Sequence, residues 1–153
     1  KTAKLFEACG TLAGILNKNN SEIISAYSKL GLKFGIIFQL IDDILDYSGD
    51  ASQIGKNLGD DLNEGKVTLP LIYAMKNSTK IQCKLIKDAI KIGDLSKLPD
   101  VIEIIESTQS ISKVQKKSEE QLKDIKLILG NMPENNFKKM ILELANYCVY
   151  RQN

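Results

Sequence analysis

The sequence predicts an all-α fold, a bundle of helices without a sheet. Apolar residues recur at helical spacing along nearly the whole chain, whereas the alternation expected of a half-buried strand is scarce. With 153 residues, a hydrophobic share of 43% and a charged share of 26%, the chain has the composition of a soluble globular protein and can bury a core. We find no internal repeat, low-complexity segment or linker, so residues 1–153 are expected to form one domain or part of one.

The first part of the chain predicts two helices and a polar loop. A helix over about residues 1–17 has one apolar face, formed by Leu5, Ala8, Leu12 and Ile15 or Leu16. Residues 17–20 form a turn, and Ser21 is a suitable N-cap for a long helix that ends near Tyr47. The core stripe of this second helix consists of Phe34, Ile37, Phe38, Ile41 and Leu45. Glycines then break the helical pattern between Ser48 and Lys66.

The rest of the chain predicts five more helices. Thr68 is a suitable N-cap, with a proline early in the helix, for residues 69–78. The others are expected at about residues 80–92, 97–108, 110–130 and 134–150. The fourth of the five is expected to bury Ile111, Val114, Leu122, Ile125 and Leu129. The last is expected to bury Phe137, Met140, Ile141, Leu144 and Cys148.

Charge, hydropathy and cysteine content exclude several classes of function. The net charge is only +2 with both signs interspersed, so no basic face indicates nucleic-acid binding. No apolar run approaches the roughly 20 residues of a membrane span, and the first residues lack the regions of a signal peptide. The chain has no histidine and its three cysteines are far apart, which excludes the usual zinc sites and histidine-based triads. Cys9, Cys83 and Cys148 are expected to be buried thiols of a cytoplasmic protein.

Three carboxylates interrupt the apolar run of residues 38–47. Helical spacing brings Asp42, Asp43 and Asp46 to neighbouring positions on one side of the helix, where their charges repel. Mg²⁺ neutralises such a cluster and keeps waters and substrate phosphates as its other ligands. Gln39, one turn earlier, lies on the same side. The alternative is that the acids form only the solvated face of an amphipathic helix.

Two lysines flank the glycine-rich loop that follows. Lys56 and Lys66 can reach the same anionic ligand that metal ions at the three aspartates hold. Polyphosphate is the natural candidate, because its oxygens bridge Mg²⁺ ions while ammonium groups neutralise the remaining charge. Solvated lysines and polar glycine-rich loops are also common without such a role.

Residues 1–8, 38–47 and 55–70 together resemble a known family. Their motifs are Lys1-Thr2-Ala3, Phe38-Gln39 followed by the three aspartates, and a Gly-Lys to Thr-Leu-Pro loop, in matching order and spacing. They resemble the C-terminal half of the trans-isoprenyl diphosphate synthases, in particular the bacterial octaprenyl diphosphate synthases. The helices expected after residue 70 also fit the C-terminal part of this family. The resemblance implies the isoprenoid synthase type of helical bundle.

The resemblance implies a role for each matching residue. Asp42, Asp43 and Asp46 match the second aspartate-rich motif of the family, which holds Mg²⁺ bridging to an allylic diphosphate. Lys1 matches a lysine that contacts this diphosphate, and Thr2 a threonine near the junction of the two substrates.

The remaining matches line the reacting centre and the leaving group. Phe38 and Gln39 match the pair between the allylic and homoallylic substrates. Lys56 matches the lysine that reaches the leaving diphosphate, and Lys66 a second basic position near it. Asp60 is an expected outer partner of the metal.

The implied reaction is a prenyl transfer. An allylic prenyl diphosphate ionises, the double bond of isopentenyl diphosphate attacks the carbocation, and a proton is lost. The implied product is a long-chain all-trans polyprenyl diphosphate of octaprenyl type, destined for quinone side chains. The family also implies a homodimer for the full-length enzyme.

The first aspartate-rich motif of the family and its basic residues for isopentenyl diphosphate have no counterpart here. We therefore expect residues 1–153 to be the C-terminal part of a single synthase domain and to be inactive alone. Two alternatives stay open. One is a non-catalytic helical subunit of a heteromeric prenyltransferase, and the other is a plain interaction bundle.

Overall fold

The computed structural model describes residues 1–48 and 58–151. Every regular element in these two ranges is a helix, as the sequence predicts. The chain divides into two compact units, which are described separately. The first consists of Lys1–Ile41 and Lys117–Arg151, and the second of the described residues within Asp42–Lys116. Helices α2 (Ser21–Ser48) and α8 (Ser110–Gly130) contribute residues to both units.

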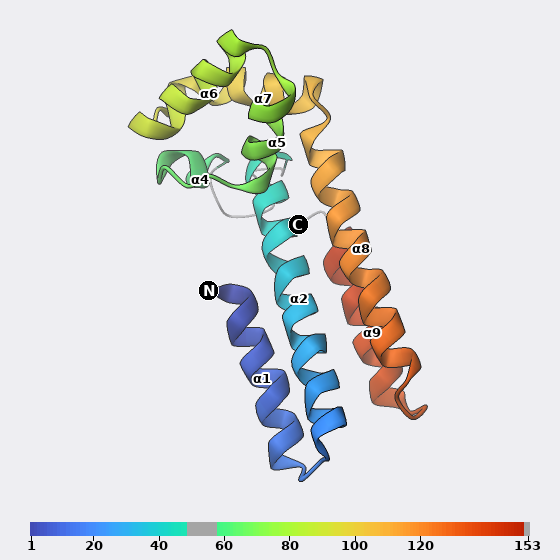
Figure 1. Cartoon of the computed structure of the whole chain (residues 1–153). Helices are drawn as coiled ribbons and strands as arrows, with labels where there is room; N and C mark the ends of the chain where they lie inside the picture. The colour runs from blue at the N-terminus through green and yellow to red at the C-terminus, as the bar shows by residue number, and fades with distance from the viewer. Residues whose placement is uncertain (49–57, 152–153) are drawn as a thin grey trace. The chain divides into compact units, whose positions relative to one another are not determined.

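In the first unit, α1 (Thr2–Leu16) lies beside α2, and α9 (Asn136–Tyr150) lies beside the second part of α8 (Figure 1). Glycines bring α1 and α2 into backbone contact. A Cβ atom added at Gly31 would lie 2.2 Å from the carbonyl oxygen of Phe6, and one at Gly35 would lie 2.6 Å from the Cα of Ala3. Because only glycine lacks this atom, the two helices approach more closely than other residues permit.

Charged and polar side chains join α2 to α8. The Lys33 ammonium donates to Asp124 Oδ2 at 2.7 Å and to Gln121 Oε1 at 3.0 Å. By length and composition alone α2 is long and apolar enough to cross a membrane, but one such helix is weak evidence of a span, because core helices of soluble proteins pass the same test. In this structure Lys33 of α2 is ion-paired to Asp124 of α8.

Two of the predicted apolar faces are wrong. Leu5, Leu12 and Leu16 of α1 are 67%, 56% and 79% exposed. The side of α1 that meets α2 carries Gly10 and Gly14 instead. In α9 the predicted core residues Phe137, Met140 and Leu144 are also exposed, and Ala145 and Val149 are buried in their place. Both helices are apolar on more than one side. The helical spacing of their apolar residues therefore does not by itself predict which face packs against a neighbour.

In the second unit, α5 (Leu69–Asn77), α6 (Lys80–Ile92) and α7 (Leu98–Ser107) surround one apolar cluster, together with α4 (Asp60–Asn63). The 3₁₀ turn η1 (Leu95–Lys97) precedes α7. The buried members of the cluster are Tyr47, Leu62, Leu71, Ala74, Ile86, Ala89, Val101, Ile104 and Ile105. A capping box between Thr79 and Gln82 starts α6, and Gly93, at φ 70°, ends it. The helices after residue 68 match the predicted ranges to within two residues.

Smaller predictions need correction. Asn20 rather than Ser21 caps α2, because its Oδ1 accepts from the backbone N–H of Ile23 at 2.9 Å. Thr68 precedes α5 as predicted, but its side chain makes no capping hydrogen bond. The cysteines are free thiols but not buried ones: Cys9 is exposed, and Cys83 and Cys148 are half-buried.

Candidate functional site

The C-terminal turns of α2 carry the three aspartates. Asp43 is buried, with 7% of its surface exposed, whereas Asp42 and Asp46 are half-buried. The intervening Ile44 and Tyr47 are buried as well. The burial of Asp43 contradicts the alternative that all three acids lie only on a solvated face.

Asp46 connects α2 to the loop that precedes α4. Its carboxylate Oδ2 accepts from the backbone N–H of Asp61 at 3.1 Å, and its carbonyl oxygen accepts from the N–H of Gly59 at 2.9 Å. Gly59 has φ 81°, a conformation that glycine adopts readily. Burial, with the nearby charge of Asp61, raises the pKa of Asp46 from 3.8 to about 6. A cation at this position would therefore relieve an unfavourable charge.

Lys66 reaches the same group of acids. Its ammonium lies 3.2 Å from Asp61 Oδ1 and 2.7 Å from Glu64 Oε2. The hydrogen bonds that Lys66 donates to Glu64 and Asp61 raise the pKa of Lys66, so this exposed side chain is charged at neutral pH. The structure thus links Asp46, Asp61 and Lys66. Asp61 had no assigned role in the sequence, because the turn that brings its amide to Asp46 leaves no clear sequence pattern.

In the first unit, two of the predicted residues meet directly. The Thr2 hydroxyl donates to Gln39 Oε1 at 3.0 Å. The contact at Gly35 makes this bond possible, because it brings the first turn of α1 against α2. Lys1 is exposed and immediately precedes Thr2 at the start of α1.

Phe38 lies beside Gln39 on α2 and is 37% exposed, so it is not the core residue that the stripe predicted. Its ring centroid is 5.8 Å from that of Phe6. The guanidinium of Arg151 lies over the Phe38 ring at 4.9 Å from the centroid, a cation–π contact that the sequence did not reveal.

The donor chemistry of the acidic residues fits a hard divalent cation. Carboxylate oxygens are the ligands that Mg²⁺ and Ca²⁺ prefer, and the pKa of Asp46 is raised first by burial and then by the negative charge of Asp61. Within residues 1–48 and 58–151, however, no group of three acidic or cysteine side chains converges to enclose a metal ion. The predicted lysine at position 56 lies outside the described residues.

Comparison with known proteins gives consistent results. A model of the polyprenyl synthetase family matches residues 1–108. The octaprenyl diphosphate synthase of Escherichia coli (strain K12) is 39% identical over 152 residues, which are 99% of this chain and 47% of that protein. The all-trans-nonaprenyl-diphosphate synthase (geranyl-diphosphate specific) of Rhodobacter capsulatus is 38% identical, with coverages of 99% and 46%.

A solved structure shows the same fold. The polyprenyl synthase of Caulobacter crescentus CB15, crystallised with calcium and isoprenyl diphosphate, has a TM-score of 0.92 and 30% identity. The match covers 100% of this chain and 47% of that one, so the chain spans about half the length of its relatives. The fold is the all-α isoprenoid synthase fold, and the chain belongs to the polyprenyl synthetase family.

Proposed function

We propose that this chain is the allylic-diphosphate-binding part of a trans-polyprenyl diphosphate synthase. The observation that carries the proposal is the acidic end of α2, where Asp43 is buried and Asp46 is linked through Asp61 to Lys66. Carboxylates that attract divalent cations and a charged lysine next to them are the two components that bind a diphosphate.

Asp42, Asp43 and Asp46 are the proposed Mg²⁺ ligands, and Asp60 is their proposed outer partner. When bound, Mg²⁺ supplies electrostatic stabilisation of the departing diphosphate. Lys66 supplies a further positive charge, and Lys56 is assigned the same role from its sequence match. Because Asp61 and Glu64 hold Lys66, a diphosphate must exchange with these carboxylates to engage it.

Lys1, Thr2, Phe38 and Gln39 are the proposed substrate-contacting residues of the first unit. The hydrogen bond from Thr2 fixes the orientation of the Gln39 amide. Lys1 supplies a positive charge one residue before Thr2, suited to a phosphate oxygen. Phe38 presents part of its ring to solvent and is suited to an apolar prenyl chain.

The proposed reaction joins isopentenyl diphosphate to an allylic prenyl diphosphate. The diphosphate leaves, the new carbon–carbon bond forms at the allylic carbon, and the proton lost from the isopentenyl carbon passes to the released diphosphate. We assign an octaprenyl-type product for quinone side chains from the identity to the Escherichia coli octaprenyl diphosphate synthase. We also propose that the full-length enzyme is cytoplasmic and forms a homodimer.

Residues 1–153 alone are proposed to bind ligand without turnover. They align with about half of each relative, and the resemblance places the first aspartate-rich motif and the isopentenyl diphosphate residues in the other half. The test is calorimetric titration of the chain with a bisphosphonate, with and without Mg²⁺. We expect Mg²⁺-dependent binding that Asp42→Asn weakens by at least tenfold, since it removes a charged metal ligand.

Glu103→Gln is the matched control, because Glu103 is an exposed acid on α7, away from the three aspartates in sequence. It should leave the affinity unchanged. Binding that is independent of Mg²⁺, or equal in the Asp42 and Glu103 variants, would contradict the proposed site. Product formed from labelled isopentenyl diphosphate by the chain alone would contradict its inactivity.

One relative supports a second candidate, a subunit of a heteromeric prenyltransferase. The heptaprenyl diphosphate synthase component 2 of Bacillus subtilis (strain 168) is 33% identical over 153 residues. The test is reconstitution of activity with a partner subunit. A non-catalytic subunit carrying Asp42→Asn would restore the activity of the partner as well as the unchanged chain does. A chain that supplies the metal ligands would no longer restore it with this substitution.

A further inference from the structure

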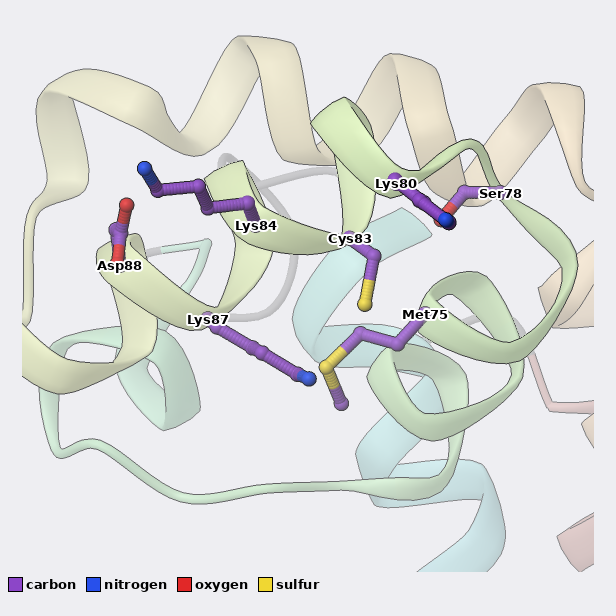
Figure 2. A pocket seen from close by; sticks show the side chains of 7 residues that line it. All are labelled: Met75, Ser78, Lys80, Cys83, Lys84, Lys87 and Asp88. Carbon is purple, nitrogen blue, oxygen red and sulfur yellow. The ribbon is translucent and has the colours of Figure 1, made fainter.

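A solvent-open pocket of about 410 Å³ lies on the second unit, and none of the residues assigned to diphosphate binding is among those that line it. It is lined by Met75 of α5, by Ser78, and by Lys80, Cys83, Lys84, Lys87 and Asp88 of α6. In Figure 2 the side chains of Met75 and Cys83 point toward each other, and Lys87 extends toward the same space. The pocket is large enough for a small polar group together with part of an apolar one.

Lysines dominate the charge around this pocket. Lys80, Lys84 and Lys87 line it against a single acid, Asp88. Lys91 continues the series, and the spacing of four, three and four residues places all four lysines on one side of α6, where they are exposed. An anionic ligand is therefore favoured here.

Ser78 also lines the pocket, and its Oγ atom makes no hydrogen bond within the part of the chain that the structure describes. This oxygen is buried, so the exposed lysines provide the groups that an anionic ligand can contact. A phosphate group fits these lysines.

Two exposed isoleucines near the pocket favour a lipid over a soluble anion as the ligand. Ile81 and Ile92 are 82% and 77% exposed, and they follow Lys80 and Lys91 directly along α6. Aliphatic side chains beside a basic stripe are typical of helices that lie on an anionic membrane surface. No aromatic residue occurs in Lys80–Ile92, whereas proteins that bind single-stranded nucleic acid use aromatic side chains to stack on bases.

We propose that the α6 surface, formed by Ser78, Lys80, Ile81, Lys84, Lys87, Lys91 and Ile92, docks on a membrane of anionic phospholipid. The pocket receives a lipid phosphate, and the two isoleucines enter the interfacial region. The aspartates of α2 do not line this pocket, and the proposal does not depend on the proposed catalytic function.

The test is flotation of the whole chain with vesicles of phosphatidylcholine, either alone or mixed with phosphatidylglycerol. Binding is expected only to the anionic vesicles and should weaken as salt is raised. Lys84→Gln and Lys87→Gln should each lower the vesicle affinity about fivefold. Ile81→Ser should lower it as well. The control is Lys123→Gln with Lys126→Gln, two exposed lysines of α8, which should have no effect.

Circular dichroism of each variant checks that the helices are intact. Equal binding to neutral vesicles, or full binding by the Lys84 and Lys87 variants, would overturn the proposal. Saturable binding of inorganic phosphate without vesicle binding would reassign the pocket to a soluble anion, and binding of an oligonucleotide alone would reassign the surface to nucleic acid. Asp42→Asn should leave vesicle binding unchanged, which separates this test from that of the prenyl site.

Discussion

At the scale of single residues, the structure explains why the acidic site has a cost in stability. The carboxylate of Asp46 is half-buried beside Asp61, and its pKa is raised from 3.8 to about 6. Between about pH 4 and 6 the folded chain holds a proton that the unfolded chain has released. Stability therefore falls as the pH rises through this interval, and the loss is complete at pH 7.

Asp46→Asn should consequently stabilise the metal-free chain at pH 7. The asparagine oxygen accepts the same N–H from Asp61 and carries no charge. We expect a gain on the order of 1 kcal/mol, discounted because water screens a half-exposed carboxylate. Urea unfolding in a chelator measures it. The gain should vanish near pH 4, and a gain that persists there would contradict the electrostatic cause. Asp88→Asn, at an exposed position, is the control.

Lys66 permits a second test at this scale. Lys66→Gln should weaken Mg²⁺-dependent bisphosphonate binding about tenfold, because it removes a charge-assisted hydrogen bond to the ligand. Titration calorimetry measures the change. Lys116→Gln, which alters an exposed lysine of α8, should bind normally. An unaltered affinity for the Lys66 variant would mean that its ammonium stays with Asp61 and Glu64.

At the scale of helices, local signals in the sequence predicted the elements well. Glycines, prolines and capping residues act within one turn, and they placed α5 to α9 to within two residues. The orientation of α1 and α9 was predicted wrongly, because their packing depends on which neighbour each helix meets. The sequence predicted an apolar face of α1 that includes Leu5 and Leu12, but these leucines are exposed, and backbone contact at glycines decides the position of the helix.

Gly35→Ala tests this packing. The added Cβ would lie 2.6 Å from the Ala3 Cα and 3.0 Å from the Phe6 Cβ, so the helices would have to separate. We expect a loss of about 1–3 kcal/mol in unfolding free energy, typical of overpacking. Gly130→Ala at the end of α8 is the control, since its Cβ would have nothing within 4 Å. Equal stability of the two variants in urea would contradict the tight contact.

At the scale of the whole molecule, the candidate site was predicted in part. The acids of α2 and the pair Thr2 and Gln39 were identified from sequence, and the structure brings Thr2 and Gln39 together. The link from Asp46 through Asp61 to Lys66 was not predicted, because it depends on the backbone turn at Gly59. Side-chain type and spacing do not encode such a turn.

The exposed leucines of α1 make a prediction at this scale. Contiguous apolar surface binds hydrophobic dyes, and Leu12, Ile15 and Leu16 together provide it. Leu16→Gln should reduce the fluorescence of bound anilinonaphthalene sulfonate. Leu127→Gln, at a leucine of α8 that is 70% exposed, should change it less. Equal effects would show that the dye senses single side chains rather than a patch.

The backbone contact between α1 and α2 also bears on how variation among relatives is interpreted. Gly31 and Gly35 cannot accept a side chain without moving Phe6 or Ala3. A side chain at either position would therefore change the spacing of the helices, and Gly35 lies one turn from Gln39, a proposed substrate-contacting residue. If relatives prove invariant at both, the invariance measures steric constraint, and an alignment alone would misread it as a sign of catalysis.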